Sequence, residues 1–450
     1  MNPDLLYDSP YIVTPFHTNI RIIFADDTAS GRPCKVIDNM LTKEVVPYYS
    51  NTHSNAYTGI LMKNLIKNTK NKIRQTYNLT NEHKIIFSGN GTTSAINHLV
   101  NSINFSQYKK TNIFISMFEH YSNHLPWIEK SKDEKNIVVS IIPIKDNLID
   151  FDWLDKHIEN DCEVLNIVTI TACSNVTGLI TDLDKVKQIA STHNFKEGNH
   201  VLLFIDCACL APHENIDMNV IDAAFISMHK FLGGPSSPGI LIAKQKLFSK
   251  SHPYNPGGGC VKKANAYNIQ YDDDLEKKET AGTPNILGII RINYVLCLRE
   301  QYYKYMTEKE QKITVYVHDQ LSRIQKNYAN LRIIMLDECV DQRIPLICLS
   351  IEHLHYNLIV ALLNDLFGIQ TRGGISCNGM LGEYMKNKYQ IDGWCRITFS
   401  WLMNDSEIDY ILSAIKFISK YGSHYKSMYK YDKSTNLFNY DCSHQYVLTQ

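Results

Sequence analysis

The sequence lacks any apolar run long enough to cross a lipid bilayer. The longest candidates, such as Val201–Ile205, end at an acid or amide within a few positions, whereas a spanning helix needs about 20 apolar residues. The N-terminal residues Met-Asn-Pro-Asp also lack the basic and apolar regions of a secretory signal. We therefore expect a cytoplasmic protein with no membrane partner, in a compartment that keeps thiols reduced.

Net charge and cysteine motifs are missing as well. The 46 Lys and Arg residues balance the 46 Asp and Glu residues, so no overall field attracts nucleic acid, and we expect no nucleic-acid partner. The 12 cysteines are scattered, and only Cys207 and Cys209 lie close together. Their spacing favours neither a zinc knuckle nor a disulfide framework. We expect most of the cysteines to be small buried thiols.

The length and the pattern of apolar runs indicate two domains. The chain has 450 residues, and a single core stops growing at about 250–300 residues. Short β-branched runs alternate with helical stretches in the first half, which predicts an α/β fold with a mostly parallel sheet covered by helices. These runs are residues 84–87, 112–117, 137–142, 164–169, 201–205, 223–226 and 240–243.

A different pattern follows Gly282-Thr283-Pro284-Asn285. It predicts a long helix from Ile286 to about Gln325 and then a smaller α+β domain. The elements expected there are strands at residues 332–335 and 346–351 and a helix near residues 357–367. From about Tyr421 the chain is rich in Tyr, Ser, Lys and Asn without periodicity, and we expect a surface extension.

Lys230 is the most informative residue. It follows a predicted buried strand directly and precedes a glycine loop, so its amine is expected where the strand end opens onto a cleft. A lone lysine in such a place is more often a solvated surface residue. Asp206 favours a second interpretation, because it ends the strand Val201–Ile205 and brings a carboxylate to the same sheet edge. An amine and an acid so placed suit a Schiff base with an aldehyde cofactor whose ring nitrogen pairs with the acid.

A glycine turn adds a candidate phosphate site. Gly89-Asn90-Gly91-Thr92-Thr93 lies between a predicted strand and a predicted helix, where free amides and threonine hydroxyls bind anions. Ser94 replaces the third glycine of a dinucleotide fingerprint and no Gly-Lys-Ser/Thr follows, so a nucleotide site is not indicated.

At this point the sequence resembles the class V, fold-type I pyridoxal-phosphate enzymes, in particular the cysteine desulfurase and selenocysteine lyase branch. The resemblance runs from about Ala25 to Ser400 and rests on the order of many motifs. These motifs are Gly91-Thr92-Thr93, Glu119-His120-Tyr121-Ser122-Asn123, Ser174-Asn175-Val176-Thr177-Gly178, Asp206 with Ala211-Pro212-His213, Ser227-Met228-His229-Lys230, Gly282-Thr283-Pro284-Asn285 and Arg372-Gly373-Gly374-Ile375-Ser376-Cys377.

The resemblance implies a fold and a domain division. The fold would be that of a fold-type I transferase, with a mostly parallel seven-stranded sheet in the large domain. Residues 1–30 would form an arm contributing to the small domain, residues 31–285 the large cofactor domain, residues 286–420 the small domain and residues 421–450 a tail. A homodimer with composite active sites is also implied, with Thr283 reaching the cofactor phosphate of the opposite subunit.

The resemblance also assigns roles to residues. Lys230 would hold pyridoxal 5'-phosphate covalently and move the α-proton, and Asp206 would keep the ring nitrogen protonated. His120 would stack on the ring and transfer protons, and Asn175 would bond the ring hydroxyl. The cofactor phosphate would be bound by Thr92, Thr93, Ser227 and His229.

The implied reaction depends on Cys377. In desulfurases such a thiolate attacks the sulfur of the substrate L-cysteine, leaving alanine and a persulfide. Arg396 would pair with the substrate carboxylate, with Arg372 as a second substrate-binding residue. L-selenocysteine is an alternative substrate, and a sulfur-acceptor protein is a possible partner.

Other readings of the same residues stay open. Cys209 stands where these relatives usually have a glutamine, and Asn378-Gly379-Met380 departs from their usual sequence after the cysteine. The chain could instead be a class V aminotransferase, epimerase or β-lyase with Cys377 not catalytic, or a non-catalytic binding protein. The pair His120 and His124 could hold a metal, but no third ligand accompanies it and we expect none.

Overall fold

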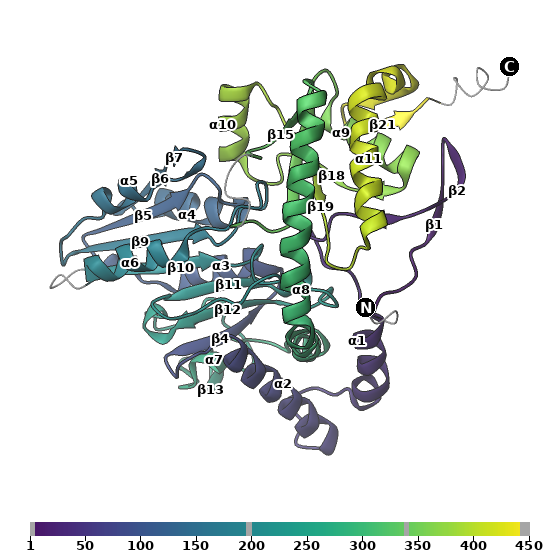
Figure 1. Ribbon diagram of the computed structural model, residues 1–450. Coiled ribbons are helices and arrows are strands. Elements are labelled where there is room, and N and C mark those ends of the chain that lie inside the picture. Colours follow the sequence, from purple (N-terminus) through teal and green to yellow (C-terminus); the bar gives the residue numbers. More distant parts are fainter. Residues whose placement is uncertain (1–4, 195–199, 337–341, 442–450) are drawn as a thin grey trace.

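The computed structural model describes residues 5–194, 200–336 and 342–441. Its centre is a seven-stranded sheet in the order β4-β12-β11-β10-β9-β5-β6 (Figure 1). Only β12 runs antiparallel to its neighbours, so the mostly parallel α/β sheet expected from the sequence is confirmed. The strands are β4 (His83–Ser88), β5 (Lys110–Ser116), β6 (Ile137–Ile142), β9 (Val164–Thr171), β10 (His200–Asp206), β11 (Ala223–Ser227) and β12 (Gly239–Lys244).

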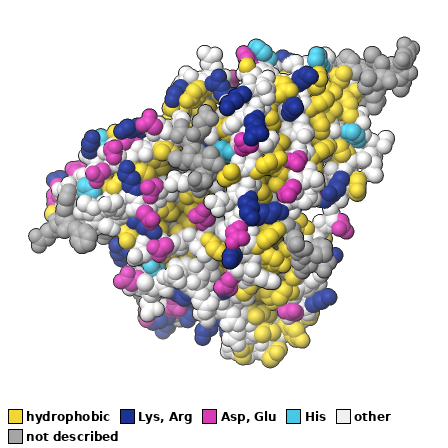
Figure 2. Space-filling model, viewed as in Figure 1, with side chains coloured by type: hydrophobic (Ala, Val, Ile, Leu, Met, Phe, Trp, Pro, Cys, Tyr) yellow, Lys and Arg dark blue, Asp and Glu magenta, His cyan; other side chains and the backbone are white. Residues whose placement is uncertain are grey.

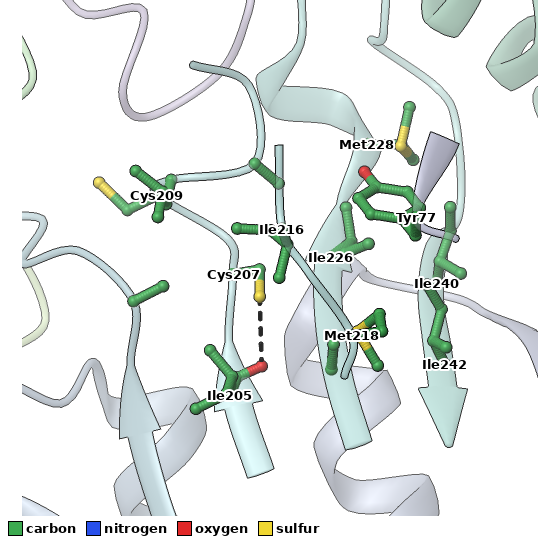
Figure 3. Close-up of a cluster of buried hydrophobic side chains, with 14 of the residues drawn as sticks. Tyr77, Ile205, Cys207, Cys209, Ile216, Met218, Ile226, Met228, Ile240 and Ile242 are labelled. Carbon is green, nitrogen blue, oxygen red and sulfur yellow. Dashed lines mark hydrogen bonds between the residues drawn. The ribbon is translucent and has the colours of Figure 1, made fainter. Parts of the chain in front are cut away.

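Helices cover both faces of this sheet, because successive residues of each buried strand point to opposite sides. Leu202 and Phe204 of β10 pack with α3 (Gly91–Ser102) and α4 (Tyr121–Asp133). Leu203 and Ile205 join the core on the other face, part of which Figure 3 shows with Ile205, Ile226 and Ile240 pointing into it. That face is covered by α2 (Tyr57–Thr76), α5 (Phe151–His157), α6 (Leu183–Asn194) and the first part of α8 (Ile286–Asn327).

Helix α8 joins this domain to the second one. Its residues Ile286–Met306 contribute to the core of the large domain, and Ile313, Val317 and Leu321 to that of the small domain. The helix starts at the residue expected from the sequence, and Asn285 caps it by accepting a hydrogen bond from the Gly288 amide at 3.0 Å. One helix therefore packs into both cores and connects the two domains.

The small domain has a four-stranded sheet in the order β15-β16-β19-β18. Its elements are β15 (Leu331–Ile333), β16 (Leu346–Ile351), β18 (Arg372–Gly374), β19 (Trp394–Thr398), α9 (Tyr356–Phe367), α10 (Gly379–Tyr389) and α11 (Asp405–Tyr421). The N-terminal arm packs on it, because β3 (Ile23–Phe24) pairs in parallel with β17 (Ile369–Gln370). The exact domain boundaries remain a prediction.

The C-terminal segment differs from the expected irregular surface extension. Gly422–Met428 is a short helix, and β20 (Tyr429–Asp432) and β21 (Leu437–Tyr440) form an antiparallel hairpin. The Tyr429 side chain is buried in the small-domain core and its hydroxyl donates to Asp365 Oδ2 at 2.7 Å. Phe438 and Tyr440 of β21 also pack against this core, whereas Tyr431 of β20 is 42% exposed.

Smaller elements surround these domains. They include α1 (Lys35–Met40), α7 (Leu275–Lys278) and the antiparallel pairs β1 (Tyr11–Thr14) with β2 (His17–Arg21), β7 (Ile144–Lys145) with β8 (Leu148–Ile149), and β13 (Val261–Ala264) with β14 (Ile269–Tyr271). Among the described helices, none is long and apolar enough to span a bilayer.

Candidate active site

One pocket, at the carboxyl ends of β9, β10 and β11, collects most of the residues singled out in the sequence. This is the position expected of a ligand site in a parallel α/β sheet, where the strand ends and following loops form a crevice. The predicted residues that line it are Thr92, Thr93, His120, Asn175, Asp206, Ser227, His229, Lys230, Arg372 and Arg396. Cys377 and Thr283 lie outside this lining, as described below.

One end of the pocket is built for an anion. Gly91 begins α3 with a left-handed backbone (φ 63°), and a Cβ there would lie 2.8 Å from Ser227 Oγ and 2.7 Å from His229 Cε1. The Thr92 amide donates to Ser227 Oγ at 3.0 Å. The hydroxyls of Thr93 and Ser122 are 2.6 Å apart. A helix N-terminus surrounded by hydroxyls suits a phosphate group.

The pocket also carries a buried acid. Asp206 is the last residue of β10, is 2% exposed and accepts a hydrogen bond from the Ala208 amide at 2.9 Å. Burial raises the pKa of Asp206, while the charge of Lys230 acts in the opposite direction. A cationic ring nitrogen bound beside this carboxyl would stabilise its ionised form.

Lys230 lines the same pocket. It ends a short helical turn, Met228–Lys230, that follows β11 directly. The N-terminal arm holds this turn, because the Gly31 amide donates to the His229 carbonyl at 2.9 Å. A Cβ on Gly31 would lie 2.1 Å from the Phe231 carbonyl oxygen. Only a glycine lets the arm approach so closely and fix the lysine toward the pocket.

His120 is held in one tautomer. It caps α4, and its Nδ1 accepts a hydrogen bond from the Ser122 amide at 3.1 Å, so the neutral ring carries its proton on Nε2. Burial lowers the pKa of His120 to about 4, and the charges of Lys230, Arg372 and Arg396 add to this shift. The ring is therefore neutral at physiological pH and has an Nε2–H available to a ligand.

Glu119 was part of a sequence motif, but no role was predicted for it. The side chain is fully buried, and it accepts hydrogen bonds from the Thr171 amide at 2.8 Å, Asn123 Nδ2 at 2.7 Å and the Ser116 hydroxyl. Burial raises the pKa of Glu119 to about 8. The network ties the ends of β5 and β9 to the first turn of α4, and it positions the neighbouring His120. A buried acid next to a candidate histidine is the sequence signal that could have suggested this role.

Two arginines lie side by side on adjacent strands of the small-domain sheet. Arg372 of β18 and Arg396 of β19 are direct partners in an antiparallel pair, which brings like charges together on one face unless an anion separates them. Arg396 is buried, and its Nη2 lies 2.8 Å from Asp26 Oδ1, an acid that the sequence analysis missed. Nε of Arg396 has no partner, and Arg372 is exposed. This pair is suited to a carboxylate ligand.

Cys377 lies on a strained turn beside the pocket. Ser376 and Cys377 have positive φ angles of 53° and 56°, a conformation that non-glycine residues seldom adopt. Two hydrogen bonds hold the turn in place. The Cys377 carbonyl accepts one from the Tyr121 amide at 2.8 Å, and the Ser376 carbonyl accepts one from Asn175 Nδ2 at 2.7 Å. The half-buried Cys377 Sγ lies 3.8 Å from Arg372 Nη2.

Thr283 lies apart from these residues. Its side chain is exposed, and its hydroxyl accepts a hydrogen bond from Asn51 Nδ2 at 3.1 Å. It does not line the pocket of its own chain. The predicted contact of Thr283 with a cofactor phosphate in a second subunit stays a prediction.

The residues of the pocket fit pyridoxal phosphate. They combine a glycine cradle that a Cβ would fill, a lysine amine and a buried acid. The fold and this site define a pyridoxal-phosphate-dependent enzyme of fold type I. The sequence profile described as "Aminotransferase class-V" matches residues 23–411, and the chain belongs to this family.

Similar proteins agree with this assignment. A cysteine desulfurase of Wigglesworthia glossinidia brevipalpis is 30% identical over 416 residues, which cover 90% of this chain and 94% of the relative. A probable cysteine desulfurase of Borreliella burgdorferi is 27% identical over 427 residues, covering 92% of this chain and 95% of the relative.

Solved structures support the fold. The apo cysteine desulfurase of Thermococcus onnurineus superposes with a TM-score of 0.78 and 19% identity, covering 89% of this chain and 95% of that chain. The cysteine desulfurase CsdA of Escherichia coli gives a TM-score of 0.72 and 22% identity, covering 87% of this chain and 93% of that chain.

Proposed function

We propose that this enzyme removes sulfur from L-cysteine, or selenium from L-selenocysteine, and releases L-alanine. The observation that carries the proposal is the Cys377 thiol, held on a strained turn beside Arg372 and next to the pocket of Lys230 and Asp206. The relatives named as cysteine desulfurases support the same reaction. Transamination, epimerisation and β-elimination are not favoured, because they give Cys377 no role.

We propose that Lys230 and Asp206 hold pyridoxal phosphate between them. The bound cofactor supplies an electron sink for bonds at the substrate α-carbon. Asp206 would pair in its ionised form with the ring nitrogen, and the anion cradle of Thr92, Ser227 and their neighbours would hold the phosphate. Lys230 Nζ moves the proton at the substrate α-carbon. The neutral His120 donates a hydrogen bond to the bound ligand from Nε2.

The substrate carboxylate binds the two arginines. Arg396 offers its unpartnered Nε, and Arg372 offers a solvent-exposed guanidinium on the same face of the sheet. Asp26 holds Arg396 in place and neutralises part of its charge. A carboxylate between the arginines relieves their repulsion, so the free α-carboxylate of an amino acid is the group this end of the site selects.

Sulfur transfer then needs the thiolate of Cys377. Its sulfur forms a bond to the substrate sulfur while the substrate C–S bond breaks, and the electron pair of that bond takes up a proton at the β-carbon to give alanine. The extra sulfur remains on Cys377 as a persulfide, which a second thiol, on a reductant or a sulfur-acceptor protein, removes. Because Cys377 must be a free thiol, we also propose a reducing, cytoplasmic location.

Substitution of the thiol tests the proposed function. Cys377→Ala should lower sulfide release from L-cysteine under reducing turnover by at least about tenfold, because the attacking group is lost. Cys297→Ala removes an exposed thiol outside the site and serves as the matched control. Equal sulfide release by Cys377→Ala and the wild type would rule out the persulfide role. L-selenocysteine is assayed separately, since selenium can leave without the thiol.

The cofactor assignment has its own experiment. The purified protein should show the visible absorption of a lysine-bound pyridoxal phosphate, and Lys230→Ala should lose it. A Lys230→Ala variant with unchanged visible absorption would contradict the assignment of the lysine.

We further propose a homodimer. The hydroxyl of Thr283 is bonded by Asn51. The segment around Asn51 exposes three aromatic side chains, Tyr48, Tyr49 and Tyr57, by 45%, 52% and 72%. Figure 2 shows hydrophobic side chains over the end of the molecule where Figure 1 draws α1 and α2. A second copy seated on this face would cover these rings and bring Thr283 toward the partner's site.

A further inference from the structure

Two cysteines without a role in the proposed reaction meet on the wall of the active-site pocket. Cys173 and Cys209 both line it, together with Lys230 and Asp206. The Cys173 thiol donates to the Gly178 carbonyl at 3.4 Å, and each of the two thiols shifts the pKa of the other. They are 36 positions apart in the sequence, so their meeting is a property of the fold.

The sheet explains why they meet. Strands β9 and β10 run in parallel with Thr171 opposite Asp206, and the Ala172 amide continues the pairing by donating to the Asp206 carbonyl at 2.8 Å. Cys173 and Cys209 follow these adjacent strand ends, which lie about 4.8 Å apart in a sheet. Disulfides form between residues with a Cα separation of about 4.4–6.8 Å. The position of the two cysteines just after adjacent strand ends therefore favours a bond between their sulfurs.

The neighbouring Cys207 shows how different the position of Cys209 is. In Figure 3 the Cys207 sulfur points to the Ile205 carbonyl inside the hydrophobic cluster, and the Cys209 sulfur points away from the labelled side chains of that cluster. Burial raises the pKa of Cys207, which keeps it an inert thiol. Cys207 is thus a natural control within the same turn.

The surroundings of the pair favour reaction at Cys209. The neighbouring Cys173 lowers the pKa of the Cys209 thiol to about 7, although burial acts in the opposite direction. The charges of Lys230, His213 and Arg396 add to the lowering. Burial raises the pKa of Cys173, which stays a thiol. The pair therefore combines a thiol of lowered pKa with a second thiol on the wall of the same pocket, which is suited to resolve a sulfenic acid.

We propose that Cys173 and Cys209 are a site of reversible oxidation by hydrogen peroxide, which closes a disulfide inside the active-site pocket. The Cys209 thiolate attacks the peroxide, the O–O bond breaks, and a sulfenic acid and hydroxide form. The Cys173 sulfur then attacks the sulfenic sulfur, and water leaves as the disulfide forms. In total, two thiols and one peroxide give one disulfide and two waters. The disulfide removes the negative charge beside Lys230, and a dithiol reductant restores it.

Mass spectrometry of the full-length protein tests this site. After treatment with hydrogen peroxide and alkylation of the remaining thiols, digestion should give a peptide in which Cys173 is linked to Cys209, about 2 Da lighter than the two reduced peptides. Dithiothreitol should abolish the link. Cys173→Ala and Cys209→Ala should both prevent it, whereas Cys207→Ala, the matched control, should retain it.

Peroxide treatment of the wild-type protein is by itself enough to overturn the proposal. Exposed Cys162 and Cys297 report whether peroxide reached reactive thiols. If these two are oxidised while Cys173 and Cys209 remain fully alkylated, or while Cys209 is found only as a sulfinic acid, the proposed site is wrong. The readout is a cross-link and not turnover, so it is independent of the proposed desulfurase reaction.

Discussion

At the scale of single residues, the site consists of ionisable groups whose burial sets their charge. The His120 ring is neutral because burial and three nearby cations lower its pKa to about 4. The neighbouring Glu119 is shifted in the other direction, to a pKa of about 8, by complete burial. Neutral groups next to Lys230 and the arginines leave the positive charge of the pocket to be balanced by an anionic ligand.

Glu119 gives a pH-dependent stability. Its folded pKa of about 8 exceeds its ordinary value of 4.5, so the folded chain keeps a proton that the unfolded chain releases between these values. Stability is therefore lost as pH rises through this window. Relative to Glu119→Gln, the free energy of unfolding of the wild type should fall by up to about 1.4 kcal/mol per pH unit. Urea unfolding at pH 5.5, 6.5 and 7.5 measures this.

An exposed acid on the same helix provides the control for this prediction. Glu129 of α4 makes only an exposed ion pair with Lys132, and Glu129→Gln should differ from the wild type by a small, nearly constant amount. A difference between wild type and Glu119→Gln that does not change with pH would contradict the shifted pKa.

At the scale of elements, the start of α3 depends on one glycine. Gly91→Ala places a Cβ against Ser227 and His229 on a left-handed backbone, a strain of roughly 1–3 kcal/mol. We expect affinity for pyridoxal phosphate to fall by about tenfold or more, as measured by titration of visible absorption. Gly89→Ala is the matched control, because its Cβ would meet Ser94 Oγ at an ordinary 3.6 Å. Equal affinities of the two variants would refute the cradle.

The C-terminal hairpin contributes to the small-domain core. Tyr429 is buried and bonded to Asp365, whereas Tyr431 on the same strand is 42% exposed. Tyr429→Ala should lower the free energy of unfolding by about 3 kcal/mol, because it leaves a cavity and an unpaired acid. Tyr431→Ala should cost about 1 kcal/mol or less. Denaturant titration compares them, and equal losses would show that the hairpin adds no core.

At the scale of the whole molecule, the proposed dimer explains the exposed rings beside Thr283. Tyr57→Asp would place a charge in the covered face and should weaken dimerisation by at least about tenfold. Tyr421→Asp, at the end of α11, is the control and should leave the dimer intact. Sedimentation equilibrium decides between these outcomes, and a wild-type monomer at micromolar concentration would contradict the proposal.

Much of the fold followed from local patterns. The runs expected as strands match β4 to β12 of the central sheet within a few residues, and β6 and β16 have the bounds expected. Lys230 and Asp206 could be placed at one sheet edge because each follows a buried strand. The hairpin at residues 429–440 was missed, because strands this short give too few alternations to stand out from an irregular segment.

Other contacts of the site could not be predicted from local patterns. Asp26 lies 370 positions from Arg396, and Glu119 52 positions from Thr171. Nothing in the spacing of the sequence specifies that these side chains meet. Such contacts depend on how the N-terminal arm pairs with the small domain and on how α4 packs against the central sheet.

The sequence by itself determined the strand and helix periods, the glycine turn and the lysine and aspartate that follow their strands, because these depend on residues close in the chain. Only the tertiary structure decided that Arg396 is paired with Asp26, that Glu119 supports His120 and that Cys173 and Cys209 line the same pocket. The physical reason is that side-chain contact between distant segments is set by strand register and packing, which no local pattern contains.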